Sequence, residues 1–160
     1  MSIMAMKQSR ILIADDHTLV AELCQKLLET EFEVVGTVSN GRALVRAAAE
    51  LKPDVIVVDI AMPVLNALDA GQQVKEKLPC VKLIYLTMNP DPEVAAEAFR
   101  RGGAGYLLKT CASSELMVAV QEVLRGRTYM SRILPKDIVN YRRHQDTHIV
   151  EEGAADRAGT

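Results

Sequence analysis

The chain has 160 residues, of which 49% are hydrophobic and 25% charged, with a formal net charge of -2. This balance suffices to fill one globular core but gives no electrostatic basis for binding nucleic acid or an anionic membrane surface, and no apolar run is long enough for a signal peptide or a membrane span. Cys24, Cys80 and Cys111 are far apart and lack metal-type spacing, so we expect buried, reduced thiols in a soluble cytoplasmic protein and no disulfide framework.

Four short apolar runs each end in a side chain suited to phosphate chemistry. In chain order, these are 11–14 before Asp15 and Asp16, 55–58 before Asp59, 83–86 before Thr87, and 106–108 before Lys109. Uninterrupted apolar runs of this length predict strands of a parallel sheet that is buried on both faces. Because ligands of such sheets lie outside the carboxyl ends of the strands, we expect three carboxylates, a hydroxyl and an ammonium to meet at one edge.

The segments between these runs alternate helix with strand. In chain order, the pattern predicts a helix over 19–28, a strand over 32–37, a helix from Asn40 to Leu51, an irregular helix within 63–78, a helix between Asp91 and Gly102, and a last helix capped by Ser113 or Ser114. Five strand–helix pairs predict an α/β fold, a doubly wound five-stranded parallel sheet with helices on both faces.

The regular pattern ends near Gly126, which sets the expected domain boundaries. We expect an N-terminal extension over 1–7, one domain over 8–127, and a remainder over 128–160 that contains a short helix over 135–144. The last ten residues have no large apolar side chain. They therefore bury too little surface to offset their ordering entropy, which predicts a disordered tail or linker.

The acidic side chains at the strand ends predict a cation site. Two like charges about 4 Å apart repel by roughly 4 kcal/mol at an effective dielectric of 20, so Asp15, Asp16 and Asp59 must take up a proton or bind a cation. Oxygen ligands in an open geometry favour Mg²⁺ or Mn²⁺. Lys109 is placed to pair with a carboxylate and then with a phosphoryl oxygen, and Thr87 offers a hydroxyl. One such residue alone is more often a cap or turn former, but the set of five predicts phosphoryl transfer onto a carboxylate.

Four motifs in these positions resemble the receiver domain of two-component response regulators. They are 11–17 (ILIADDH), 58–63 (VDIAMP), 86–88 (LTM) and 105–109 (GYLLK), and the first and last are similar to the LuxR/NarL/FixJ-type subfamily. The resemblance covers roughly residues 8–127. It implies a flavodoxin-like, CheY-like sheet with the strand order 2-1-3-4-5.

The resemblance also implies a ligand set and a phosphoacceptor. Asp59 would take a phosphoryl group from the phosphohistidine of a sensor histidine kinase. Asp16, Asp59 and the backbone carbonyl of Ala61 would ligate Mg²⁺ directly, and Asp15 would hold the metal through water. His17 is better explained as the start of the first helix than as a ligand, because neutral imidazole is a poor ligand for Mg²⁺.

The resemblance further implies how the signal leaves the site. Lys109 would bind a phosphoryl oxygen, Thr87 would be the switch hydroxyl and Tyr106 the switch aromatic, and the phosphorylated protein would form a homodimer. The protein would catalyse only its own phosphorylation and dephosphorylation. The subfamily continues into a DNA-binding domain, for which residues 128–160 are too few. DNA would therefore be reached only through an output domain absent from this chain, unless the protein is a stand-alone receiver.

Two departures from the family pattern keep an alternative open. Ala67 stands where relatives usually have glycine, and alanine would be strained if that position needed a positive φ. Met88 stands where a small residue is common, and its bulk is expected to slow loss of the phosphoryl group. The alternative is a pseudo-receiver that acts by protein–protein contacts independently of phosphorylation. An aspartyl-phosphate hydrolase is disfavoured because Ala61 replaces its acid/base carboxylate, and a flavin or nucleotide module because the first loop is acidic.

Overall fold

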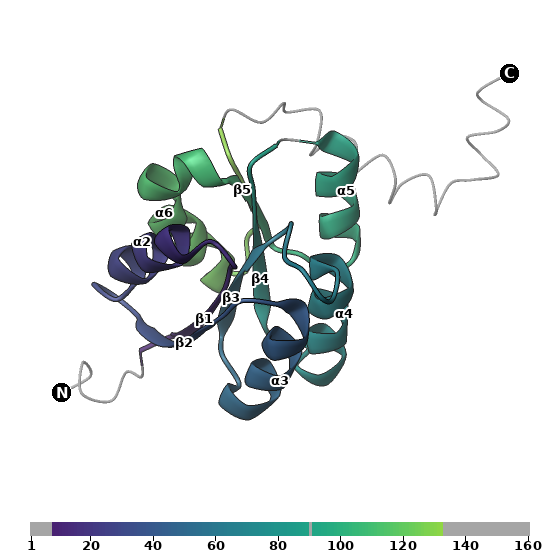
Figure 1. The fold of residues 1–160 in the computed structure, drawn as a ribbon. Helices are drawn as coiled ribbons and strands as arrows, with labels where there is room; N and C mark the ends of the chain where they lie inside the picture. The colour runs from purple at the N-terminus through teal and green to yellow at the C-terminus, as the bar shows by residue number, and fades with distance from the viewer. Residues whose placement is uncertain (1–7, 90, 133–160) are drawn as a thin grey trace, which may run out of the picture.

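A parallel sheet with helices on both faces forms the centre of the computed structural model, which describes residues 8–89 and 91–132 (Figure 1). Its elements are β1 (Arg10–Ala14), α2 (Thr18–Leu28), β2 (Glu33–Val38), α3 (Gly41–Leu51), β3 (Val55–Asp59), α4 (Ala67–Lys77), β4 (Lys82–Thr87), α5 (Pro92–Arg100), β5 (Gly105–Leu108), the 3₁₀ turn η1 (Lys109–Cys111), α6 (Ala112–Leu124) and β6 (Tyr129–Met130). The strands pair in parallel in the order β2-β1-β3-β4-β5-β6.

Two apolar layers, one on each face of the sheet, explain why the strands read as uninterrupted runs. Leu12 and Ala14 of β1 point into the layer covered by α3, α4 and α5, whereas Ile11 and Ile13 point into the layer covered by α2 and α6. Figure 1 shows the same division, with α2 and α6 on one side of the sheet and α3, α4 and α5 on the other. A strand with both faces buried needs apolar residues at every position.

The predicted doubly wound, flavodoxin-like fold and the order of its five predicted strands are confirmed. The structure adds a sixth strand that the sequence did not predict. β6 is two residues long and pairs Tyr129 with Gly105 and Met130 with Tyr106. The expected domain end at residue 127 stays a prediction, with the sheet continuing past it, and the expected helix over 135–144 lies outside the described residues.

Helix ends follow the sequence signals at two places and depart from them at a third. Asn40 caps α3 by accepting a hydrogen bond from the backbone N–H of Ala43 at 2.8 Å, and Asp91 caps α5. The expected serine cap of the last helix is wrong, because η1 runs directly into α6 and Cys111 is the residue before it. The hydroxyl of Ser114 instead donates to the carbonyl of Cys111.

The apolar stripe predicted for the first helix is only partly buried. Leu19 and Leu23 are 80% and 41% exposed, because α2 packs through the neighbouring face that carries Cys24 and Leu28. Burial of all three thiols was also expected. It holds for Cys24, whereas Cys80 is exposed, and all three cysteines are free thiols. Within the described ranges, none of the helices has the length and apolar character needed to cross a membrane.

Candidate functional site

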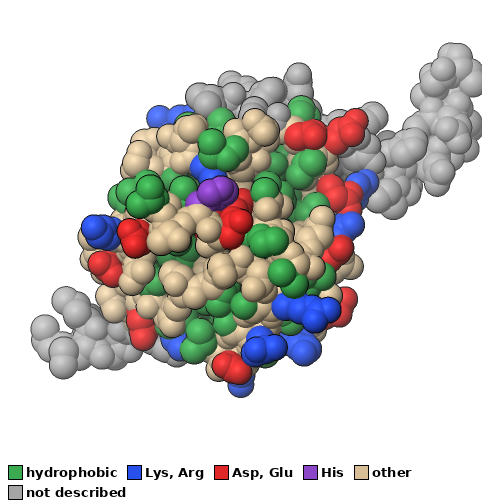
Figure 2. All heavy atoms as spheres, in the orientation of Figure 1, with side chains coloured by type: hydrophobic (Ala, Val, Ile, Leu, Met, Phe, Trp, Pro, Cys, Tyr) green, Lys and Arg blue, Asp and Glu red, His purple; other side chains and the backbone are tan. Residues whose placement is uncertain are grey.

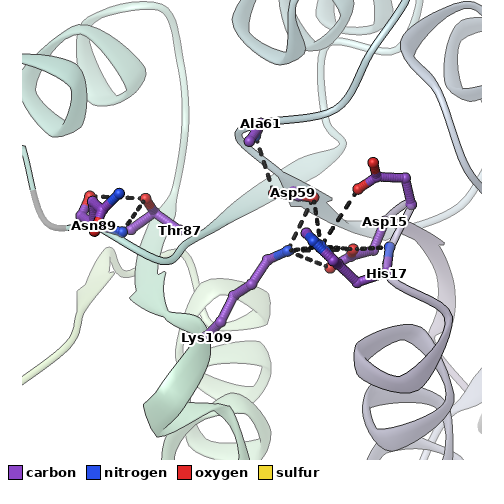
Figure 3. A network of polar contacts seen from close by, with 8 residues as sticks. Asp15, His17, Asp59, Ala61, Thr87, Asn89 and Lys109 are labelled. Atoms are coloured by element: carbon purple, nitrogen blue, oxygen red, sulfur yellow. Dashed lines mark hydrogen bonds and ion pairs between the residues drawn. The ribbon is translucent and has the colours of Figure 1, made fainter.

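The predicted side chains meet at the carboxyl edge of the sheet (Figure 3). Asp15 follows β1, Asp59 ends β3, Thr87 ends β4 and Lys109 follows β5, and all four are buried. The ammonium nitrogen of Lys109 lies 3.0 Å from Asp59 Oδ2 and 3.2 Å from Asp15 Oδ2. Asp16 lies at the rim, where its side chain is 36% exposed. The structure thus brings the three carboxylates and the ammonium together, as the strand-end pattern predicts.

Asp59 is held as a carboxylate. Its Oδ1 accepts a hydrogen bond from the backbone N–H of Ala61 at 3.0 Å. Burial by itself raises the pKa of Asp59, but the Ala61 N–H and the Lys109 ammonium together outweigh burial and lower that pKa below its usual value. The carboxylate is therefore ionised at neutral pH and available as a nucleophile.

The pKa of Asp15 is shifted in the opposite direction to that of Asp59. Its pKa is raised, first by burial and then by the nearby charge of Asp59, although the His17 N–H and Lys109 oppose this effect. Asp15 Oδ2 and Asp59 Oδ2 are buried and accept no hydrogen bond within residues 8–89 and 91–132, with Lys109 facing both as an ion pair. Buried oxygens with unused lone pairs beside a second carboxylate fit a hard divalent cation.

We predict that Asp15→Asn stabilises the protein in the absence of divalent cations. Because the folded-state pKa of Asp15 is raised, folding favours the protonated form of this side chain. The stabilisation from the protonated form is complete below the unfolded-state pKa and is lost as the pH rises through the folded-state pKa. At neutral pH the ionised side chain therefore opposes folding. We therefore expect urea unfolding at pH 7 to show a higher free energy of unfolding for the variant than for the wild type. At 100 times its dissociation constant, Mg²⁺ should stabilise the wild type by about 2.7 kcal/mol and the variant by less. A variant that is less stable than wild type without metal would contradict this prediction.

His17 belongs to the site as well as marking the start of the helix. It is the residue that precedes α2, as expected. Its Nδ1 lies 2.7 Å from Lys109 Nζ, 3.2 Å from Asp15 Oδ1, 3.4 Å from Asp16 Oδ1 and 3.5 Å from Asp59 Oδ2. An ammonium has no acceptor, so Nδ1 accepts from Lys109. In Figure 2, the purple histidine side chain lies against red acidic side chains near the middle of the face. In the sequence, the feature that could have placed His17 in the site is that it directly follows Asp15 and Asp16. The sequence alone assigned it only to the start of the first helix.

Neither Thr87 nor Tyr106 forms a hydrogen bond with the three carboxylates in the part of the chain that the structure describes. The Thr87 hydroxyl donates to the carbonyl of Asn89 at 2.9 Å and accepts from its N–H at 3.2 Å, which turns it toward the loop after β4 (Figure 3). Tyr106 is fully buried, and burial raises the pKa of its phenol although the nearby Thr87 hydroxyl opposes this effect. Its hydroxyl makes no hydrogen bond of ordinary geometry among the described residues. A cavity of about 360 Å³ is lined by both side chains.

In the loop after Asp59, the residue with a positive φ is Val64 and not Ala67. Ala67 is the first residue of α4 and is helical, so alanine costs no backbone strain there. The positive φ in this loop, 78°, belongs to Val64, and such a value is rare for a β-branched residue. Met88 is 57% exposed at the end of β4. Its expected effect on the lifetime of a phosphoryl group stays a prediction.

We predict that Gly41→Ala disturbs this loop. A Cβ at Gly41 would overlap the backbone carbonyl of Leu65 and lie 2.6 Å from the Leu65 Cβ, so the loop backbone itself must move. We expect a loss of about 1–3 kcal/mol in urea unfolding. Gly36→Ala is the matched control, because its added Cβ would meet only side chains, the nearest 3.4 Å away. Equal stability of the two variants would contradict the prediction.

Comparisons with known proteins agree with this geometry. A family model described as the response regulator receiver domain matches residues 11–121. The oxygen regulatory protein NreC of Staphylococcus haemolyticus is 35% identical over 134 residues, which are 82% of this chain and 62% of that protein. The transcriptional regulatory protein YdfI of Bacillus subtilis is 36% identical over 124 residues, 76% of this chain and 58% of that protein. The chain thus spans about three fifths of the length of these relatives.

Solved structures give the same result. A LuxR-family two-component response regulator from Aurantimonas sp. SI85-9A1 has a TM-score of 0.76 at 26% identity, and the match covers 88% of this chain and 99% of that one. The signal receiver domain of the response regulator NarL from Mycobacterium tuberculosis has a TM-score of 0.72 at 26% identity, with 76% of this chain and 100% of that one covered.

Proposed function

Since the chain belongs to the response regulator receiver domain family, with LuxR- and NarL-type regulators among its relatives, we propose that it is a phosphorylation-activated receiver whose acceptor is Asp59. Receiver domains of this family are signalling domains and not enzymes in the ordinary sense. The observation that carries the proposal is the state of Asp59. Its carboxylate is 1% exposed, has a lowered pKa and faces the Lys109 ammonium at 3.0 Å.

The proposed reaction is a direct phosphoryl transfer. A carboxylate oxygen of Asp59 attacks phosphorus, so a new P–O bond forms while the P–N bond of a sensor kinase's phosphohistidine breaks. The departing imidazole keeps the electron pair and takes up a proton. Lys109 then pairs with a phosphoryl oxygen, as its position between two carboxylates allows, and its charge stabilises the transferred group. Loss of the phosphoryl group to water would reset the receiver.

Asp16, Asp59 and the Ala61 carbonyl would hold Mg²⁺ or Mn²⁺ directly, with Asp15 contributing through water. Candidate ligand atoms of Asp15, Asp16, His17 and Asp59 all lie within 4.8 Å of one another. The cation would neutralise charge on the carboxylates and on the incoming phosphoryl oxygens. The protein's own part is to keep Asp59 ionised through the Ala61 N–H and Lys109, and to keep the acceptor buried from bulk water.

We expect Thr87→Ala to separate phosphorylation from its structural consequence. To reach a phosphoryl oxygen on Asp59, the Thr87 hydroxyl must leave both hydrogen bonds with Asn89, and the movement opens space beside Tyr106. Amide NMR shifts of Asn89 and Tyr106 should respond to acetyl phosphate in the wild type. In Thr87→Ala they should respond several-fold less, while the phosphoryl adduct persists. An undiminished response in the variant would remove Thr87 from the switch.

The biological role proposed for the chain is control of transcription. The YdfI relative is named a transcriptional regulatory protein, and this chain matches 58% of it. DNA would be contacted by an output domain outside these 160 residues, in a cytoplasmic protein that forms a homodimer when phosphorylated.

Phosphoryl acceptance is tested by intact-mass spectrometry. The wild type is incubated with acetyl phosphate and Mg²⁺, and a parallel sample contains excess EDTA. We expect one phosphoryl adduct with Mg²⁺ and little or none with EDTA. A folded protein that gains no adduct with Mg²⁺ would favour the pseudo-receiver alternative.

A further inference from the structure

A second buried polar cluster surrounds Glu115, which lies in the first turn of α6. Glu115 is 6% exposed. Its Oε1 accepts hydrogen bonds from the Tyr129 hydroxyl at 2.7 Å and from the Arg132 backbone N–H at 3.1 Å. Its Oε2 accepts from the Ser131 hydroxyl at 3.3 Å. One buried carboxylate thus binds three donors of a single four-residue segment, 129–132, which we call the exit segment.

The exit segment is hydrogen-bonded on its other side to β5 and to Ala104, the residue before it. The backbone N–H of Tyr129 donates to the carbonyl of Ala104 at 2.9 Å, and the N–H of Ser131 donates to the carbonyl of Tyr106 at 3.0 Å. The N–H of Leu108 donates to the Ser131 hydroxyl at 3.1 Å. Ser131 is 2% exposed, so it joins Glu115 to β5 inside the protein.

These contacts reach the candidate site through adjacent residues. Leu108 is followed directly by Lys109, whose ammonium contacts Asp59 and Asp15. The carbonyl of Tyr106, the proposed switch aromatic, accepts the hydrogen bond from the Ser131 N–H. A shift of β5 that follows a movement of Lys109 must therefore move the exit segment or break its hydrogen bonds.

A two-residue strand does not hold such a segment by itself. β6 contains only Tyr129 and Met130, and short terminal strands fray at little cost in free energy. The Glu115 carboxylate supplies the buried acceptor that keeps the segment on the sheet. Burial and Glu115 raise the pKa of Tyr129 to about 12, so its hydroxyl remains a donor at neutral pH.

We propose that Glu115 is a coupling residue, which fastens the exit segment to β5 and so transmits the phosphorylation state of Asp59 to the chain that continues beyond residue 132. The inference rests on the proposed phosphorylation of Asp59. It assigns a role to a buried carboxylate that takes no part in phosphoryl transfer, and its partner is this chain's own continuation.

The test is amide hydrogen exchange in the exit segment of the full chain, with and without acetyl phosphate and Mg²⁺, with intact mass recorded on the same samples. In the wild type, we expect the amides of Tyr129 and Ser131 to change exchange rate several-fold as the adduct forms. In Glu115→Ala, these amides should exchange about tenfold faster without phosphodonor and lose the response, while the adduct still forms. Glu50→Ala, which removes an exposed carboxylate from α3, should behave as wild type.

Tyr129→Phe serves as a milder variant should Glu115→Ala fail to fold, because it removes one of the three donors. It should show faster exchange and a weaker response. A wild-type adduct without any change in the exit segment would overturn the coupling and leave the proposed function standing. Unaltered exchange and response in both variants would overturn the role of Glu115. Absence of the adduct from the wild type would overturn both proposals.

Discussion

Asp59→Asn is expected to abolish the phosphoryl adduct while leaving the protein folded. The amide has nearly the same shape, but it lacks the charge that Lys109 and the Ala61 N–H favour, and it is not a nucleophile for phosphorus at neutral pH. We expect the adduct to fall by at least about a hundredfold in intact mass after incubation with acetyl phosphate and Mg²⁺.

The stability of this variant should also change with pH in one direction. Because the folded-state pKa of Asp59 is lowered, the ionised side chain stabilises the fold above its unfolded-state pKa, and this contribution is lost as the pH falls through the folded value. Asp59→Asn should therefore lose less stability than wild type on acidification.

Asp54→Asn, at an exposed position before β3, is the control for phosphoryl acceptance. An adduct of wild-type size on Asp59→Asn would mean that another group is the acceptor.

Lys109→Met is expected to have the second largest effect. Lys109 is the cation that lies within 3.3 Å of both Asp15 and Asp59 in the described structure. Its side chain is 3% exposed, so the substitution leaves two buried carboxylates without their cation. Removing one partner of a buried ion pair costs about 3–5 kcal/mol, and we expect a loss of that size in urea unfolding without divalent cations.

Mg²⁺ should recover part of this loss, because a cation can replace the missing charge beside the carboxylates. Phosphoryl acceptance should slow by about a hundredfold, the usual effect of removing one group that stabilises transferred charge. Lys26→Met, at an exposed position of α2, should change neither property. A Lys109→Met protein as stable as wild type without metal would show that Asp15 and Asp59 do not need this cation.

The buried strands and their polar ends could be predicted from sequence for a simple reason. A strand covered on both faces needs apolar residues throughout, so the first polar residue after the run marks the edge of the sheet. For that reason the convergence of Asp15, Asp59 and Lys109 followed from topology alone. Their distances and burial did not.

The features that sequence missed depend on tertiary contacts. β6 has only two residues and no apolar run, and it forms by pairing with residues far back along the chain, such as Tyr129 with Gly105. The Ser131 hydroxyl next to it is held by Glu115 of α6. The exposure of Leu19 depends on which face of α2 meets the sheet, and a helical stripe leaves that rotation open. Ala67 is unstrained because α4 begins at this residue, and the positive φ of the loop is found at Val64 instead. The sequence alone does not specify where the helix begins.

The most direct test of the central claim is to locate the phosphoryl group on the chain. Wild-type protein is loaded with acetyl phosphate and Mg²⁺, the acyl phosphate is reduced with borohydride, and peptides are sequenced by mass spectrometry. Reduction converts the phosphorylated aspartate to homoserine, and we predict homoserine at position 59 alone. Homoserine at position 15 or 16, or its absence from a folded and Mg²⁺-loaded protein, would contradict the assignment of Asp59 as the acceptor.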